Sequence, residues 1–377
     1  ILSEFDSIPI LKKDIIRKYW SDIISKDYKT RKYYYNATGG ATGEPLRFIQ
    51  DISYAKWRRA TLYYYYNWIL NIDEPVIKKV ILWGSIRDLR RNRSLKTKFL
   101  NWLSNTIFLN CFRMTERDIK RYIKIINSYK PDLIRGYAGA LYELCRYAER
   151  KHIRLHRPKV VIAAAETLYN EMREAIEGRF QTKVYNFYGS RELGPIAGEC
   201  SEGLMHIFSF NNYVEILDRN NMRVDEEGAK GKIIVTNLHN YSMPFIRYEI
   251  GDIATVGPKK CKCGNLLPTL LHVDGRIIEH FVREDGTFVP GEFFIHVIGV
   301  VHNKGFIRKF KVIQEDFKKI RILVIPEKKI NNHIKENIEN EIKMVMGQDV
   351  QIIWELVDDI PKTSEGKFLY TKSLVWK

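Results

Sequence analysis

The chain has 377 residues, of which 45% are hydrophobic, enough to bury a sizeable core and, by the usual size of domains, to form two of them. Its net charge of +17 favours anionic partners such as nucleotides, nucleic acids, acidic glycans or a membrane surface. The composition excludes a disordered tail, and no apolar run approaches the ~20 residues that span a bilayer. The first residues lack a signal-peptide pattern, and the five cysteines are an odd number that fits a reducing compartment, so we expect a cytoplasmic protein.

The first half of the chain alternates strand-like and helix-like patterns. Residues 1–30 begin as a helical segment, and a polar stretch then leads into a glycine-rich loop. Apolar runs at 80–83 and 160–164 predict buried strands. Stripes of apolar residues at helical spacing within 119–126 and 141–148 predict helices, and Cys111 and Cys145 fall on such apolar stripes and should be core residues. This alternation predicts an α/β domain.

The second half has a different texture. From about residue 205, short strand patterns with turn signals at 213–217, 231–235 and 251–254 predict a β-rich subdomain appended to the α/β body. In the last hundred residues, strand patterns at 310–313 and 320–324 precede a charged helix at about 331–346 and a strand at 350–353. This order predicts a small α+β domain.

The densest local signal is the glycine-rich segment 36–45, with the sequence Asn-Ala-Thr-Gly-Gly-Ala-Thr-Gly-Glu-Pro. Backbone N–H groups of such a loop can surround phosphate oxygens, and its hydroxyls add further donors. It is not a Walker loop, because no Gly-Lys-Ser/Thr follows. Taken alone, a flexible turn between strands explains the segment slightly better.

Four further segments decide between these interpretations. They are Tyr188–Glu192 (YGSRE), Arg247–Asp252 (RYEIGD), Asp274–Arg276 (DGR) and Pro361–Lys367 (PKTSEGK). Together with Thr38–Pro45, and in this order, they resemble the sequence elements of the adenylate-forming acyl-CoA synthetases and ligases. Within that superfamily the chain most resembles the phenylacetate–CoA ligase-like group, and in it the branch found in capsular and surface polysaccharide gene sets. The segments that carry this finer resemblance are Met243–Tyr248, Ser190–Glu192 and Cys261–Gly264.

The resemblance implies a two-part architecture. Residues 1–276 would form the large adenylation domain, with 205–276 as its β-rich subdomain, and 277–377 would form a mobile lid that turns about a hinge near Arg276–Glu279. The N-terminal helical segment of the family would precede Leu2 and is missing from this sequence. The expected fold class is therefore α/β with a small C-terminal α+β domain.

The resemblance also implies a reaction that uses ATP and Mg²⁺ to convert a carboxylic acid into an acyl-adenylate, with release of pyrophosphate. Charge builds on the phosphorus centre during this step, so cations and N–H donors must surround it. Lys367 would close on the α-phosphate and the acyl carboxylate, and Arg276 would act with it. Glu192 would position Mg²⁺, a hard cation suited to carboxylate and phosphate oxygens.

The remaining nucleotide contacts follow from the same resemblance. The loop residues that would hold the β- and γ-phosphates are Thr38, Gly39, Gly40, Thr42 and Gly43. Asp252 would take the ribose hydroxyls, Tyr188 with the adjacent Gly189 would line the adenine site, and Glu166 would flank the base. Arg191 stands where most of the superfamily has Thr, so its guanidinium would have to replace the usual α-phosphate contact electrostatically.

A second cluster suggests a metal. Cys200 and His206 come just after the YGSRE segment, and Cys261 and Cys263 form a Cys-x-Cys-Gly turn, a knuckle-like shape that Zn²⁺ favours. A structural Zn²⁺ that pins the β-rich subdomain to the core would explain the four residues. Buried thiols together with a surface histidine are the alternative.

Two questions of function stay open at this stage. The acyl acceptor is either the thiol of CoA, as in phenylacetate–CoA ligase, or an amine on a sugar or amino acid, which would make the protein an amide ligase. A protein of another class, a non-catalytic binder of nucleic acid or anionic glycan, is supported by the net charge and by the basic run Arg87–Lys98. A solvated helix face explains that run better, so nucleic acid is not an expected partner. The sequence identifies neither the acid nor the oligomeric state, a homodimer included.

Overall fold

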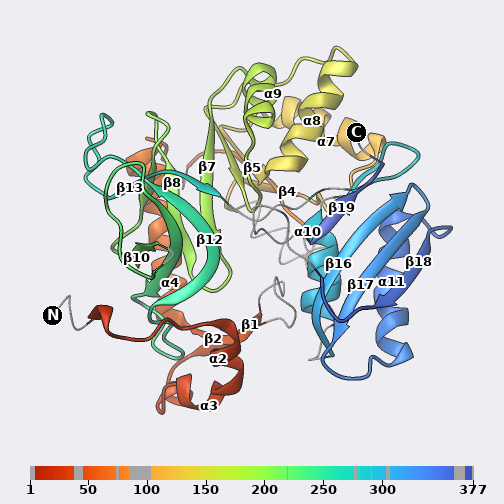
Figure 1. Ribbon diagram of the computed structural model, residues 1–377. Coiled ribbons are helices and arrows are strands. Elements are labelled where there is room, and N and C mark those ends of the chain that lie inside the picture. The colour runs from red at the N-terminus through yellow and green to blue at the C-terminus, as the bar shows by residue number, and fades with distance from the viewer. Residues whose placement is uncertain are drawn as a thin grey trace. The chain divides into compact units, whose positions relative to one another are not determined.

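The computed structural model describes residues 5–37, 46–73, 76–84, 103–218, 220–274, 279, 281–289, 291–302, 306–360 and 370–375 (Figure 1). The chain divides into two compact units, each assembled from segments that are far apart in the sequence. The first unit contains residues 1–37, 46–74 and 185–275, and the second contains 38–45, 75–184 and 276–377.

The first unit starts with short elements and a hairpin. These are α2 (Lys13–Lys18), α3 (Trp20–Ile23), the 3-10 turn η1 (Tyr28–Thr30), β1 (Tyr33–Ala37) and β2 (Arg47–Asp51). The antiparallel strands β1 and β2 flank residues 38–45. Helix α4 (Ile52–Tyr64) follows and continues into a π-helical turn, η2 (Tyr65–Ile69). Asp51 begins α4 as its N-cap, because its carboxylate accepts a hydrogen bond from the backbone N–H of Tyr54 at 3.0 Å.

The rest of the first unit is an antiparallel sheet. Its strands are β7 (Val184–Ser190, in this unit from Tyr185), β8 (Gly194–Glu199), β9 (Met205–Ile207), β10 (Asn212–Leu217), β11 (Lys230–Asn237), β12 (Tyr248–Val256) and β13 (Thr269–Asp274). They are hydrogen-bonded in the order β10-β11-β12-β13-β9-β8-β7. One buried core joins the hairpin to this sheet through residues such as Phe48, Ile196 and Val235. The strands predicted at 213–217, 231–235 and 251–254 are confirmed.

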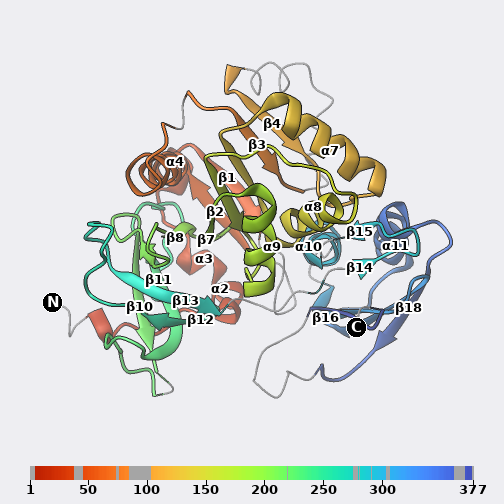
Figure 2. The same ribbon diagram turned by 90° about the horizontal axis from the view of Figure 1, so that it is seen from above.

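The second unit contains the parallel part of the fold. Its strands β3 (Lys79–Leu82), β4 (Thr106–Leu109), β5 (Leu133–Tyr137) and β6 (Val160–Ala164) pair in parallel in the order β6-β5-β3-β4. The helices are α7 (Glu116–Tyr129), α8 (Ala138–Arg150) and α9 (Asn170–Phe180) (Figure 2). The predicted stripes on α7 and α8 are buried, and Cys111 and Cys145 lie in the same core, as expected.

The C-terminal part of the second unit has a sheet of its own. Its strands are β16 (Ile307–Asp316), β17 (Lys319–Pro326), β18 (Gln351–Leu356) and β19 (Thr371–Ser373), ordered β18-β17-β16-β19, and helix α11 (Asn332–Met346) packs Ile334, Ile338 and Ile342 into the core (Figure 1). Short elements precede it: β14 (Phe281–Val282), β15 (Phe288–Val289), α10 (Gly291–Phe294) and the π-helical turn η3 (Ile295–Val301). The predicted strand–strand–helix–strand order is confirmed, and β19 is an addition that the sequence pattern did not predict. The α/β fold with a small C-terminal domain is thereby confirmed, while the boundary at residue 276 stays a prediction.

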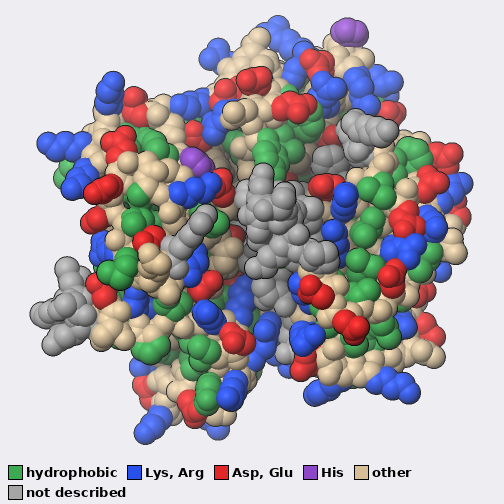
Figure 3. Space-filling view, viewed as in Figure 1, with side chains coloured by type: hydrophobic (Ala, Val, Ile, Leu, Met, Phe, Trp, Pro, Cys, Tyr) green, Lys and Arg blue, Asp and Glu red, His purple; other side chains and the backbone are tan. Residues whose placement is uncertain are grey.

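Charge is distributed rather than concentrated on the visible surface. On the face drawn in Figure 3, lysine and arginine side chains are interspersed with aspartate and glutamate. Within the described ranges, no helix has both the length and the apolar character needed to cross a membrane.

Candidate functional site

Two of the sequence segments singled out above interlock in the first unit. Tyr188 on β7 donates its hydroxyl hydrogen to Oδ2 of Asp252 on β12 at 2.8 Å. In the opposite direction, Tyr248 on β12 donates to Oε1 of Glu192, which follows β7, at 3.1 Å. The structure therefore brings together the carboxylate expected to position a metal and the one expected to hold a ribose, each through a tyrosine of the other's segment.

The turn between β7 and β8 gives Glu192 its position. A Cβ on Gly189 would lie 2.5 Å from the carbonyl oxygen of Gly194, and Gly194 itself has a φ of +69°, so both positions favour glycine. The backbone N–H of Leu193 donates to Oγ of Ser190 at 3.2 Å, which closes the turn. As a result Glu192 is 6% exposed, while the side chain of Arg191 is exposed.

A buried ion pair fixes the beginning of β12. The guanidinium of Arg247 contacts both carboxylate oxygens of Glu215, at 2.9 Å and 3.2 Å, and the two side chains are 6% and 0% exposed. Arg247 also has a φ of +49°, an uncommon conformation for a residue with a Cβ. This pair fixes Arg247, the residue directly before Tyr248. Tyr248 in turn lies four positions before Asp252.

Glu166 lies in the second unit and has a defined partner there. It follows β6 and Ala165, whose φ of +69° is unusual for alanine. Its Oε2 accepts a hydrogen bond from the backbone N–H of Gly139, in the first turn of α8, at 2.5 Å. A carboxylate at this end of a helix is stabilised by the unpaired N–H groups and by the helix dipole.

Several of the predicted site residues lie outside the described residues. They are Thr38, Gly39, Gly40, Thr42, Gly43, Arg276 and Lys367, and the basic run Arg87–Lys98 lies outside as well. Of the expected hinge, Glu279 is described. Its carbonyl accepts from the hydroxyl of Thr371 at 2.6 Å, and its Oε2 accepts from the backbone N–H of Ser373 at 2.7 Å. Glu279 is thereby tied to strand β19.

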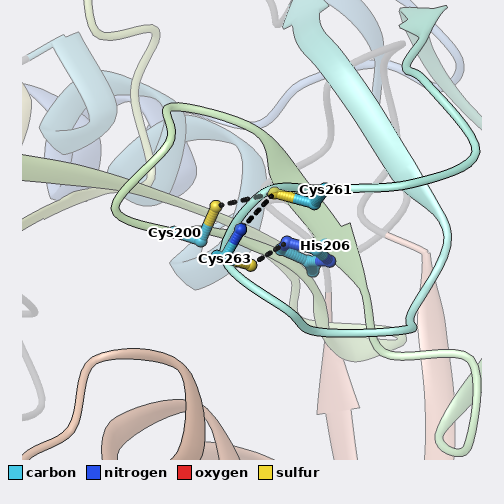
Figure 4. Close-up of side chains that lie close together, drawn as sticks. All are labelled: Cys200, His206, Cys261 and Cys263. Atoms are coloured by element: carbon cyan, nitrogen blue, oxygen red, sulfur yellow. Dashed lines mark hydrogen bonds between the residues drawn. The ribbon is translucent and has the colours of Figure 1, made fainter.

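The four predicted metal ligands converge (Figure 4). Cys200 follows β8, His206 lies on β9, and Cys261 and Cys263 lie in the connection from β12 to β13. Their ligand atoms all lie within 4.8 Å of one another. The sulfurs of Cys200 and Cys261 are 3.6 Å apart, and Sγ of Cys263 is 3.2 Å from Nε2 of His206. Thiolates at the usual Zn–S distance in a tetrahedron lie about 3.8 Å apart, so these spacings fit zinc.

The surroundings of the cluster also suit a metal. Nδ1 of His206 is 3.1 Å from the carbonyl oxygen of Leu267, an acceptor that places the hydrogen on Nδ1 and leaves Nε2 facing the thiols. Gly264, with a φ of +81°, allows the Cys261–Gly264 turn. His206 is 0% exposed, so the alternative of a surface histidine beside two thiols is wrong.

The pKa values of the Cys200 and Cys261 thiols are shifted in opposite directions. Desolvation would raise the pKa of Cys200, but its interactions with the side chain of His206, with the backbone and with Cys261 outweigh it and hold that pKa below its ordinary value. The pKa of Cys261 is raised, chiefly by desolvation. A thiolate at one position of the cluster is the form that binds a metal.

The sequence reasoning missed some residues of the site. Tyr248 lies inside a recognised segment, but nothing in the sequence pairs its hydroxyl with Glu192. Gln50, at the end of the strand Arg-Phe-Ile-Gln-Asp, is 1% exposed and contacts the backbone of the same turn. Three of the five residues of this strand are polar, so the sequence carries no signal that singles out Gln50, although a buried amide must have hydrogen-bond partners.

Solved structures of known proteins share the fold of this chain. The fold is shared with solved structures of 2-hydroxyisobutyryl-CoA ligase: a complex with 2-HIB-AMP and CoA in the thioesterification state has a TM-score of 0.62 and 19% identity, covering 99% of this chain and 82% of that one. An open conformation of the same ligase, also in complex with 2-HIB-AMP and CoA, has a TM-score of 0.58 and 18% identity, covering 98% and 82%. This chain therefore shares the fold of that CoA ligase.

Relatives in sequence narrow the assignment. Residues 281–373 match the family described as the CapK C-terminal domain. Protein CapK of Staphylococcus aureus is 26% identical over 377 residues, covering 97% of this chain and 79% of the relative. Phenylacetate-coenzyme A ligase of Thermus thermophilus is 25% identical over 280 residues, covering 67% of this chain and 62% of the relative. The chain is thus a homologue of CapK and of phenylacetate-coenzyme A ligase, which confirms the resemblance seen in the sequence.

Proposed function

We propose that this protein is an acid–CoA ligase that uses ATP and Mg²⁺ to activate a carboxylic acid. A carboxylate oxygen attacks the α-phosphorus of ATP, the α–β anhydride bond breaks and pyrophosphate leaves, giving an acyl-adenylate. The CoA thiolate then attacks the acyl carbonyl carbon, and AMP leaves with the electron pair of the broken bond. CoA is the acceptor that the relatives favour, since a phenylacetate-coenzyme A ligase and a ligase solved with CoA are among them.

The observation that supports this proposal most is the crossed pair of tyrosine–carboxylate hydrogen bonds. Glu192 and Asp252 lie 60 positions apart, and Tyr188 and Tyr248 join their segments at 2.8 Å and 3.1 Å. Bound Mg²⁺ would neutralise charge on the phosphates, and Glu192 offers it a fixed oxygen ligand because the turn and Tyr248 hold the carboxylate. Asp252, partly exposed, is placed to accept from ribose hydroxyls.

The remaining roles are proposals of the same kind. The loop 38–45 supplies N–H donors to the β- and γ-phosphates, Lys367 and Arg276 supply positive charge to the α-phosphate and carboxylate, and Glu166 flanks the base. Arg191 adds a further cation next to Glu192. The residues 277–377 act as a lid that admits the acceptor after adenylation.

The test is carboxylate-dependent ATP–pyrophosphate exchange with aryl, fatty, amino and sugar acids, followed by product analysis with CoA or with amines. We expect exchange with a subset of acids and a thioester with CoA. We expect Lys367→Ala to abolish exchange, and Lys372→Ala, an exposed neighbour that loses the same charge, to retain it. Unchanged exchange in Lys367→Ala contradicts the proposed roles. Amide formation instead of a thioester would make the protein an amide ligase, and a salt-sensitive gel shift without ATP use would make it a non-catalytic binder.

We also propose that Cys200, His206, Cys261 and Cys263 hold one structural Zn²⁺, which would fasten the β8–β9 hairpin to the β12–β13 connection. Metal analysis of purified protein should give about one equivalent, and less than half an equivalent removes the proposal. Cys263→Ser should lose the metal. The matched control Cys145→Ala, at a buried thiol on α8, should lose stability but keep the metal.

A further inference from the structure

The backbone of the Arg191–Glu192 turn is held by one buried carboxamide. Nε2 of Gln50, on β2, donates to the carbonyl oxygen of Arg191 at 2.8 Å and to that of Glu192 at 3.1 Å. The hydroxyl of Tyr54 adds a longer bond to the carbonyl of Arg191 at 3.3 Å. Gln50 is 1% exposed, so its amide has no water to replace these partners.

The orientation of this amide follows from its partners. Carbonyl oxygens accept hydrogen bonds and cannot donate them, so the amide nitrogen must face Arg191 and Glu192. The other end, Oε1, accepts from Nδ2 of Asn36 on β1 at 3.0 Å. Gln50 therefore uses both of its N–H groups on the Glu192 turn and its oxygen on the strand that leads into residues 38–45.

Other buried carboxamides hold the same hairpin without this second connection. Nδ2 of Asn212 donates to the carbonyls of Leu193 and Pro195 at 3.3 Å and 2.7 Å. Asn211 donates to the carbonyl of Pro195 at 3.1 Å and is likewise 1% exposed. These bonds stabilise β8 and the end of the turn, but they do not contact the backbone of Glu192 or strand β1. Asn211 is therefore a matched control for Gln50.

We propose that Gln50 is a positioning residue for Glu192, because it couples the turn that carries this metal ligand to strand β1. This inference rests on the proposed function of the site. A carboxylate that binds a metal must be held to within about 0.5 Å of its productive position. Loss of Gln50 frees the carbonyls of Arg191 and Glu192, and with them the carboxylate, to shift relative to β1.

The test compares Gln50→Leu with Asn211→Leu, two substitutions that each remove a buried carboxamide bonded to the β7–β8 hairpin. The principal measurement is the Mg²⁺ concentration that gives half-maximal ATP–pyrophosphate exchange. We expect it to rise about 10- to 100-fold in Gln50→Leu, the usual effect of removing a group that orients a metal ligand. In Asn211→Leu it should stay near the wild-type value although the melting temperature falls. Equal shifts in the two variants, or no shift in Gln50→Leu, overturn the inference.

Two additions keep the test decisive. Of the hydrogen bonds that Gln50 makes, Asn36→Ala removes only the one to Oε1, at a partly buried position, so this variant should fold even if Gln50→Leu does not. It should raise the Mg²⁺ requirement by a smaller factor than Gln50→Leu. An unchanged requirement in Asn36→Ala overturns the coupling. The second readout is the rise in melting temperature that MgATP gives, titrated with Mg²⁺. If the wild type shows this rise but no acid supports exchange, the proposed function fails, and the coupling is still judged by whether Gln50→Leu shifts the titration while Asn211→Leu does not.

Discussion

The buried pair of Arg247 and Glu215 gives the sharpest stability prediction. Glu215→Gln keeps the size of the side chain and one acceptor, but it removes the charge opposite the guanidinium and turns an NH₂ group toward Nε or Nη2 of Arg247. Breaking a buried ion pair by removing one partner typically costs about 3–5 kcal/mol, because the other charge stays buried and uncompensated. Nη1 of Arg247 keeps its bonds to the carbonyls of Asp6 and Ile8, so we expect the low end, about 3 kcal/mol.

Urea unfolding followed by tryptophan fluorescence and circular dichroism measures this loss. Glu226→Gln, an exposed acid between β10 and β11, is the charge-matched control and should change stability by less than about 0.5 kcal/mol. The double variant Glu215→Leu with Arg247→Met should be more stable than Glu215→Gln, because a nonpolar pair has no buried charge to compensate. A loss below about 1 kcal/mol in Glu215→Gln would refute the reasoning.

Four further substitutions have predicted outcomes. Desolvation raises the pKa of the buried Glu143, although Arg150 and Arg146 oppose it. The folded protein then binds more protons than the unfolded chain between the two pKa values, so this stabilising contribution is complete below the unfolded pKa and is lost as pH rises through the folded one. Glu143→Gln should therefore gain stability over the wild type at about pH 8 and lose that advantage at about pH 4, as thermal melts at the two pH values would show; an equal difference at both contradicts the assignment. Tyr248→Phe should raise the Mg²⁺ requirement for exchange roughly ten-fold through the lost bond to Glu192, with little change in melting temperature, and an unchanged requirement would show that the hydroxyl does not orient the carboxylate. Gly178 is exposed in α9 with open space around an added Cβ, so Gly178→Ala should raise the free energy of unfolding in urea by about 0.5–1 kcal/mol. A Cβ on Gly198 would lie 2.4 Å from the buried ring of Tyr65, so Gly198→Ala should lower it by about 1–3 kcal/mol. A change of the same sign in both variants would contradict the packing.

Much of the fold could be predicted because its elements have strong periodic patterns. The buried runs at 80–83 and 160–164 became β3 and β6, and the charged helix expected at 331–346 became α11. The short strand β19 could not be predicted, since a three-residue pattern at 371–373 carries no usable period. Its place beside β16 is set by tertiary pairing, which local sequence does not encode.

The candidate site divides in the same way. Cysteines and a histidine at knuckle-like spacing carry their chemistry in the sequence, and the structure brings Cys200, His206, Cys261 and Cys263 together. The depth of His206 was misjudged in the alternative interpretation, because burial depends on the pairing of β9 with β8 and β13. Gln50 was missed because the partners of its amide nitrogen are backbone carbonyls more than a hundred positions away, and any residue type can supply those.

The interleaving of the two compact units bears on how the protein is made. Strands β1 and β2 of the first unit find their core partners on strands between residues 185 and 275, and the core of the second unit joins residues around 80–184 to residues beyond 280. During synthesis on the ribosome, apolar side chains of the N-terminal third therefore stay exposed to solvent until most of the polypeptide has emerged. Chains with such distant pairings fold slowly and are prone to aggregate meanwhile. Expression at low temperature, where hydrophobic association is weaker, should therefore improve the yield of native protein.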